Sequence, residues 1–369
     1  MRILHYYDNS DDMVSQHVKL LTGGMGLEAD NHQATESEQA KTLLKGGQYD
    51  LLHIHGCWRN SQRAIVREAL RQGVRIVLTP HGQLQPWVQD ERFWGEKLPK
   101  RLLYQRDIVE RAYAVIVQGQ MELGCMDRLG WNPRTVVIRN AVLTSSISPT
   151  DMARQTSRVY RKVLDSNTLE LMSEETRDAL RDMLTAGITG DRRWLKAGDD
   201  TPAEGYSISQ DEWRKLLCYA HQEQIMETIQ RGIRVLDLDA PDLDVSKIDY
   251  FLPASFKQTE SIQNAIGNQF PSENERLLAT FRVLRKWSVG TRLGISHLVE
   301  LDRELRSYAC EESELNEELK DRRLWSLASR LMQLMSELTG LTEGFMPVVP
   351  TDDRTTRRLR RQIDNHLHI

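Results

Sequence analysis

Three apolar runs of the sequence end in residues that could do chemistry: DLLHIHG with His55 and Gly56, IVLTPHG with His81 and Gly82, and VVIRNA with Arg139 and Asn140. Glycine lets a backbone approach a ligand without a Cβ in the way. A helical segment begins near Asn60, and the free N–H groups at its start favour an anion. The three runs therefore mark a candidate binding site.

Strands and helices must alternate to bring these runs together. The expected strands are Arg2–Tyr7, a weaker one near Leu27–Asn31, Asp50–His55, Arg75–Thr79, Ala114–Gln118 and Thr135–Arg139. Helical segments lie between them, and this alternation predicts a parallel sheet covered on both faces. Ligands of an open parallel sheet bind beyond the carboxyl ends of its strands. His55 and His81 fall at that edge.

The same residues also have structural interpretations. A histidine beside a strand is often only a hydrogen-bonded structural residue. Two His-Gly pairs on consecutive strands favour function because both fall at one sheet edge. Trp58 and Trp87 would either pack the loops or stack on a ligand.

The second half of the chain loses the alternation and reads as a series of helices. Ser148-Pro149-Thr150-Asp151 is a capping box with proline at the first helical position. Further helices are expected from about Ser209, Ser272, Ile295 and Glu312. The sequence thus predicts an α/β Rossmann-like domain over residues 1–165, an α-helical domain over 166–345 and a basic C-terminal tail over 346–369.

Composition is that of a globular protein in a reducing compartment. The chain has 369 residues and a net charge of −4, so no general bias toward nucleic acid is present. Its four cysteines, Cys57, Cys125, Cys218 and Cys310, form no Cys-x-x-Cys pair, which argues against a zinc cluster or a disulfide scaffold. The N-terminus reads as a strand and not as a signal peptide, and no apolar run of about 18 residues exists. We expect a cytoplasmic protein.

Three blocks of the first half form a set: HGCW at 55–58, LTPHGQLQPW at 78–87 and KLPKRLLY at 97–104. Together they resemble the N-terminal domain of family 4 glycosyltransferases, bacterial enzymes that build surface polysaccharides and lipopolysaccharide. The resemblance covers about residues 1–142 and implies half of a GT-B fold, in which two Rossmann-like domains face across a cleft. The segment at 148–164 is similar to the closing helix of these enzymes.

The resemblance also implies roles for individual residues. In such enzymes the N-terminal domain takes the acceptor and the C-terminal domain holds the sugar nucleotide. It places His81 at the transferred sugar as the candidate catalytic residue, with Gly82 in the loop that faces the donor. It places His55, Gly56, Trp58 and Trp87 among the substrate-binding residues, and Arg139 and Asn140 at the end of the last strand.

Two features depart from the family pattern. Instead of a glycine-rich loop, the acidic run Asp8-Asn9-Ser10-Asp11-Asp12 follows the first strand, and its carboxylates would repel a phosphate. After residue 165 we recognise neither a second βαβ domain nor a glutamate pair in a glycine-rich setting. We expect a helical module in the place of the nucleotide domain. Sugar transfer requires that the leaving diphosphate be neutralised, which half of a cleft does not fully provide.

Two further segments carry charge. The carboxylates of Asp237, Asp239, Asp242 and Asp244 are oxygen ligands, but their spacing does not fit a calcium loop, and we predict no metal site. Lys97, Lys100 and Arg101 alternate with apolar residues. They would either contact an anionic membrane peripherally or form the solvated face of a domain helix.

Two functions follow as alternatives. The first is a glycosyltransferase-like protein that binds a sugar or lipid-linked sugar acceptor and takes a nucleotide sugar as donor, with the helical half or a partner chain binding that donor. The second is a non-catalytic accessory protein that docks a true transferase, or a copy of itself, through its helices. No nucleic-acid motif accompanies the arginines at 354–361, so no nucleic-acid partner is expected.

Overall fold

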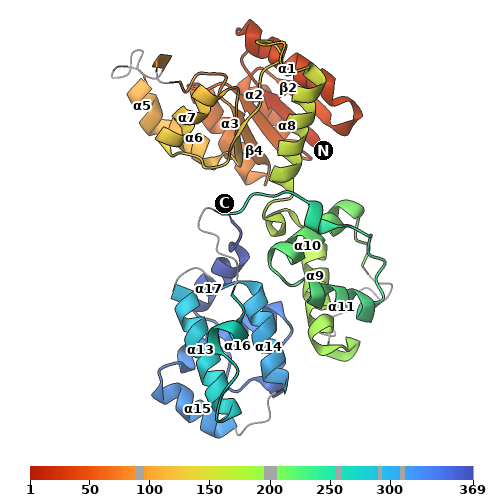
Figure 1. Ribbon diagram of the computed structural model, residues 1–369, viewed down its shortest axis with the longest axis vertical. Helices are drawn as coiled ribbons and strands as arrows, with labels where there is room; N and C mark the ends of the chain where they lie inside the picture. The colour runs from red at the N-terminus through yellow and green to blue at the C-terminus, as the bar shows by residue number, and fades with distance from the viewer. Residues whose placement is uncertain are drawn as a thin grey trace. The chain divides into compact units, whose positions relative to one another are not determined.

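A parallel sheet of six strands, in the order β2-β1-β3-β4-β5-β6, forms the centre of the N-terminal unit (Figure 1). The strands are β1 Arg2–Tyr6, β2 Asp30–Ala34, β3 Leu51–His55, β4 Arg75–Thr79, β5 Ala114–Val117 and β6 Thr135–Val137. Every neighbouring pair is parallel. This computed structural model describes residues 1–85, 87–88, 95, 97–194, 206–253, 260–289, 293–307 and 312–368. Pro86 and Cys310 lie outside the described residues.

Helices cover both faces of this sheet. They are α1 Asp12–Met25, α2 Ser37–Lys45, α3 Asn60–Arg71, α5 Leu98–Lys100, α6 Arg106–Arg111, α7 Gln120–Leu129 and α8 Pro149–Leu164. Leu4 of β1 packs in one core with α2, α3, α6 and α7, whereas the preceding Ile3 packs in the other with α1 and α8. The opposite directions of successive strand side chains produce the two cores. The predicted Rossmann-like sheet is confirmed.

Helix α8 ends the N-terminal unit by packing along α1. Ser148 caps its first turn through a hydrogen bond from the Asp151 N–H, and Pro149 occupies the first helical position. Gly24 of α1 permits the close approach, since a Cβ there would lie 2.8 Å from the Cβ of Ala153. The segment that resembles the closing helix of the transferases thus belongs to the N-terminal unit. This unit consists of residues 1–166 and of a short second segment that begins at Asp249.

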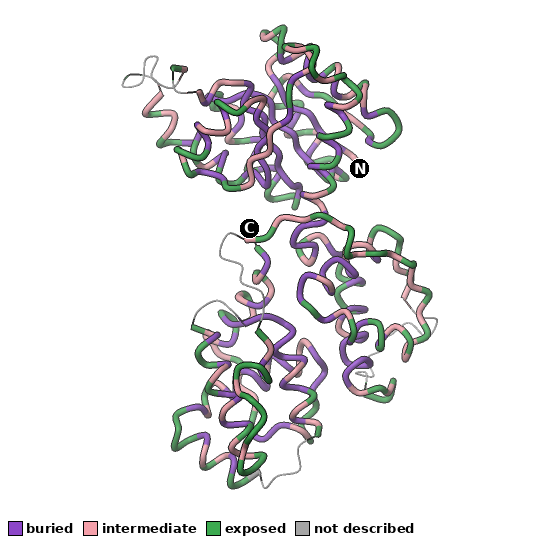
Figure 2. Tube along the Cα trace, viewed as in Figure 1, coloured by how far each residue is buried: buried purple, intermediate pink, exposed green. Residues whose placement is uncertain are grey.

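The second compact unit contains helices and, in its described part, no strand. These helices are α9 Glu174–Thr189, α10 Gln210–Gln222, α11 Met226–Leu236, α12 Ile262–Ile266, α13 Glu273–Val289, α14 Ile295–Ser307, α15 Glu312–Asp321, α16 Trp325–Leu338 and α17 Arg354–Asp364. Their buried apolar residues form one cluster, and Figure 2 colours the buried positions of these helices purple. The predicted α-helical region is confirmed.

Two elements differ from their expected form. The weak strand is β2, which lies a few residues later than expected, and of its residues only Ala34 is buried. The expected basic tail contains helix α17, whose Leu359 and Ile363 pack into the helical core. Arg330 of α16 holds this segment through an ion pair with Asp353, the capping residue of α17. The arginines of α17 therefore project from a packed helix.

Candidate functional site

The loops after β3 and β4 turn sharply at the carboxyl edge of the sheet. Gly56 follows β3 with a φ of 87°, and its N–H donates to the Thr79 carbonyl of β4 over 2.8 Å. After β4, His81 and Gly82 have φ values of 53° and 78°. A left-handed conformation suits glycine but costs energy at a histidine, and such strain is typical of functional loops.

A buried carboxylate fixes the His81-Gly82 loop. Glu122 of α7 accepts hydrogen bonds from the Gly82 N–H at 2.7 Å and from the Gln118 N–H at 2.9 Å. Burial raises the pKa of Glu122, whereas these two hydrogen bonds oppose the rise. The Gly82 amide, which the resemblance places in the loop facing the donor, is engaged by a carboxylate of its own domain.

Trp58 connects the loop after β3 to the loop after β4 through hydrogen bonds. Its φ is 67°, its indole N–H donates to the Gln83 carbonyl over 2.8 Å, and its own carbonyl accepts from the Tyr104 hydroxyl over 2.8 Å. The ammonium of Lys97 lies 4.8 Å from the centre of the ring. Because the side chain is buried, the structure favours the packing interpretation of this residue.

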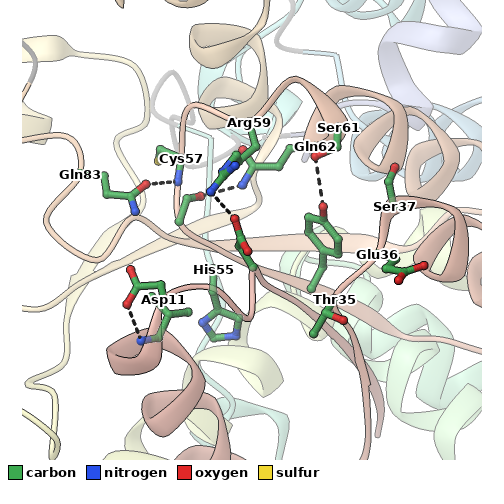
Figure 3. A pocket seen from close by; sticks show the side chains of 14 residues that line it. Asp11, Thr35, Glu36, Ser37, His55, Cys57, Arg59, Ser61, Gln62 and Gln83 are labelled. Carbon is green, nitrogen blue, oxygen red and sulfur yellow. Dashed lines mark hydrogen bonds and ion pairs between the residues drawn. The ribbon is translucent and has the colours of Figure 1, made fainter.

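A pocket of about 350 Å³ opens at the same edge of the sheet (Figure 3). The starts of α1, α2 and α3 and the loop after β3 surround it. Its lining residues are Tyr6, Asp8, Asp11, Val14, Thr35, Glu36, Ser37, His55, Gly56, Cys57, Arg59, Ser61, Gln62 and Gln83. His55 and Gly56 are the sequence-predicted residues among them.

The pocket lining mixes polar and apolar surface and carries more negative than positive charge. Three carboxylates, from Asp8, Asp11 and Glu36, line it together with one guanidinium, Arg59. Arg59 forms an ion pair with Asp8, and hydrogen bonds from Ser10 and the charge of Arg59 hold the pKa of Asp8 below its ordinary value. Hydroxyl groups that donate hydrogen bonds suit such a lining, whereas an anion would meet repulsion.

The remaining predicted residues lie away from this pocket lining. Trp87 is 56% exposed. Arg139 donates to the Ser146 hydroxyl over 2.9 Å at the surface. The guanidinium of Arg101 lies 5.0 Å from the ring centre of Trp131, and Lys100 is half-buried.

Five buried histidines gather on the α1 and α8 side of the sheet: His5, His17, His53, His55 and His81. His5 pairs in register with His53. His55 Nδ1 lies 3.2 Å from His81 Nε2, and His55 Nε2 lies 3.1 Å from His5 Nδ1. Sequence reasoning missed His5 and His17. The position of His5 two residues after Ile3, on the same face of β1, is a signal that could have identified it, but only tertiary packing brings His17 of α1 to the cluster.

Asn140 joins this cluster, because its amide oxygen lies 3.0 Å from His17 Nδ1. Among the residues that the structure describes, the groups of three spaced as metal ligands consist of histidines. Of the acidic segment after α11, Asp237 ends the helix in a left-handed conformation and Asp244 caps the turn at Ser246.

A parallel sheet sandwiched by helices, with a polar pocket beyond the carboxyl ends of its strands, defines the Rossmann-like class of ligand-binding domains. Within that class, residues 25–141 match the family model of the glycosyl transferase 4-like domain. This part of the N-terminal unit is therefore similar to a glycosyl transferase 4-like domain. Neither the curated proteins nor the solved structures give a significant match to the chain. No helix in the described residues has the length and apolar character needed to cross a bilayer.

Proposed function

We propose that the chain is a glycosyltransferase-like protein of bacterial surface polysaccharide or lipopolysaccharide synthesis, and that the pocket at the carboxyl edge of its sheet binds a sugar acceptor. The observation that carries this proposal is the pocket itself, on a glycosyl transferase 4-like domain. Carboxylates and side-chain amides accept hydrogen bonds from sugar hydroxyls, and charged acceptors make the stronger ones. The excess of carboxylates disfavours a phosphate in the same place.

The donor would be a nucleotide sugar that binds outside this pocket. Glu122 already engages the Gly82 amide, so the diphosphate would need cationic groups from the helical half or from a partner chain. In this arrangement His81 stands nearest the transferred sugar, while His55 and Gly56 contact the acceptor.

Calorimetric titration of the full chain with a panel of neutral oligosaccharides and nucleotide sugars tests the acceptor pocket. We expect an oligosaccharide to bind saturably, and Glu36→Gln to weaken it about tenfold through loss of one charge-assisted hydrogen bond. Glu38→Gln is the matched control, because Glu38 lies in the first turn of α2, which Glu36 precedes, and it is exposed and pairs with Lys41 outside the pocket lining. Equal affinities in the two variants, or no oligosaccharide binding at all, would contradict the proposal.

A lipid-linked acceptor would require peripheral contact with the inner face of the membrane. The segment after α5 supports this, because Leu102 and Leu103 are 76% and 63% exposed and lie beside Lys100 and Arg101. Apolar side chains flanked by cations suit an anionic bilayer surface. Flotation with phosphatidylglycerol vesicles should recover the protein, and the double change Leu102→Ser with Leu103→Ser should abolish the recovery.

A non-catalytic accessory role is the second candidate. It is favoured by the all-helical character of the described chain after Asn167, since a nucleotide-binding domain would require a second βαβ layer. In this case no nucleotide sugar would stabilise or be hydrolysed by the protein, and a separate transferase would co-purify with it. Saturable stabilisation by one nucleotide sugar, lost in His81→Ala with the fold intact, would exclude the accessory role.

A further inference from the structure

The buried histidines behind the pocket present lone pairs whose directions can be worked out from their neighbours. Asn31 is oriented by its own amide, which donates from Nδ2 to the Ala29 carbonyl. Its oxygen must then accept from His5 Nε2, 3.1 Å away. Protonation of His5 at Nε2 leaves Nδ1 to accept from His55 Nε2. The neutral His55 ring therefore carries its lone pair on Nδ1.

A second chain of hydrogen bonds orients His17. The Val142 N–H donates to the Asn140 amide oxygen over 3.0 Å, which identifies this atom as the acceptor. His17 Nδ1 must then donate its proton to the same oxygen. The lone pair of His17 lies on Nε2, for which no hydrogen-bond partner occurs among the described residues. Histidines that bind metals usually donate their other ring proton to a carbonyl or carboxylate oxygen in this way.

His81 supplies a third nitrogen. Its Nε2 lies 3.2 Å from His55 Nδ1, and two nitrogen ligands on one tetrahedral zinc ion are about 3.3 Å apart, given Zn–N bonds of about 2.0–2.1 Å. The side-chain amide of Gln118 donates from Nε2 to His81 Nδ1 over 2.7 Å. A half-turn of that amide would present its oxygen instead, moving the His81 proton to Nδ1 and freeing Nε2 as a ligand.

We propose that His17, His55 and His81 form a three-histidine site for a divalent transition-metal ion such as Zn²⁺. One ligand atom from each ring lies within 4.8 Å of the others, and all three side chains are buried. Three imidazoles leave a fourth position on a tetrahedral ion for a non-protein ligand. His55 also lines the pocket, so the ion would adjoin the proposed sugar site.

The hydrogen bonds of the buried histidines favour this triad over the other candidate group. The alternative group of His5, His53 and His55 is less suited. Both nitrogens of His53 are occupied, by the Tyr160 hydroxyl at 2.5 Å and the Thr79 hydroxyl at 2.7 Å.

The test is metal titration of the full chain, prepared without a histidine tag and stripped with a chelator. We expect one Co²⁺ per chain with the visible absorption of tetrahedral cobalt, displaced by one Zn²⁺. His17→Gln should abolish stoichiometric binding while the rest of the histidine chain stays intact. Asn140→Ala, which removes the group that orients His17, should weaken binding about 10- to 100-fold. His32→Gln, at the half-buried surface of β2, should bind as the parent does.

Failure of the unmodified chain to bind one equivalent overturns the proposal, whatever the variants do. Binding that is unchanged in both His17→Gln and His81→Gln also overturns it, provided that circular dichroism shows both variants folded. The histidines would then form a hydrogen-bonded chain without a metal. Sugar binding is measured separately on stripped protein, so the outcome for the pocket does not decide the outcome for the metal.

Discussion

Tyr160 provides a sharp test of how α8 completes the N-terminal unit. Its ring is fully buried in the core that α8 shares with the sheet. Its hydroxyl is hydrogen-bonded to His53 Nδ1 of β3 over 2.5 Å. Tyr160→Phe keeps the ring and removes the hydroxyl, so that a buried ring nitrogen loses its partner. Tyr160→Ala removes the packing as well.

The expected losses differ in size. An unsatisfied buried polar group costs ~1–3 kcal/mol, so we expect Tyr160→Phe to lower the free energy of unfolding of this unit by that amount. Truncation of a large buried ring costs ~3–5 kcal/mol, which sets the expectation for Tyr160→Ala. Since ~1.4 kcal/mol is a tenfold change, the Phe variant should reduce amide protection of β3 about 5- to 150-fold.

Hydrogen-exchange mass spectrometry of the full chain separates the two units, which a single melting curve cannot. Tyr206→Phe is the matched control, because the Tyr206 hydroxyl donates to Asp182 over 2.6 Å within the helical unit. That variant should leave β3 unchanged. Unaltered protection of β3 in both Tyr160 variants would refute the role assigned to α8.

Two further predictions concern the helical unit. Gly187→Ala should destabilise it by at least ~1–3 kcal/mol, because the new Cβ would overlap the backbone of α11, whereas Gly23→Ala in α1, with no atom within 4 Å of its Cβ position, should be tolerated; thermal unfolding of the two variants compares them. Burial lowers the pKa of His297 from 6.5 to about 4. The unfolded chain therefore takes up a proton first, and stability falls as pH drops below 6.5. Between pH 7 and 5 this effect is worth ~2 kcal/mol, partly offset by His366, whose pKa Glu223 raises against its burial. His297→Gln should flatten this loss in amide protection of α14, and an unchanged pH dependence would contradict the assignment.

Sequence patterns were sufficient for the elements whose local signals agree with their burial. The strands β3 and β4 are fully buried apolar runs and were predicted within a residue. The predicted position of β2 differs from the observed one because its residues, DNHQA, carry almost no apolar signal. Its position is set by pairing with β1, from Arg2 against Asp30 to Tyr6 against Ala34. A long-range pairing of this kind leaves no local trace in the chain.

The site was only partly predictable for a similar reason. The placement of His55 and Gly56 at the edge of the sheet follows from the strand ends, and both line the pocket, whereas their role in binding stays a prediction. The acidic residues after β1 would repel a phosphate, and two of them, Asp8 and Asp11, line the pocket, where they suit a ligand with hydroxyl groups. His17 could not be assigned from the sequence, since a lone histidine on an amphipathic helix is compatible with many environments. Its partner Asn140 lies 123 positions away in the chain.

Hydrogen exchange of the full chain with and without its tightest-binding oligosaccharide tests the central claim most directly. An acceptor in the pocket should protect the segments 8–14, 35–37 and 55–62 that line it, and Glu36→Gln should reduce that protection at equal ligand concentration. Protection confined to the helical unit, or distributed without regard to these three segments, would contradict the assignment of the acceptor site.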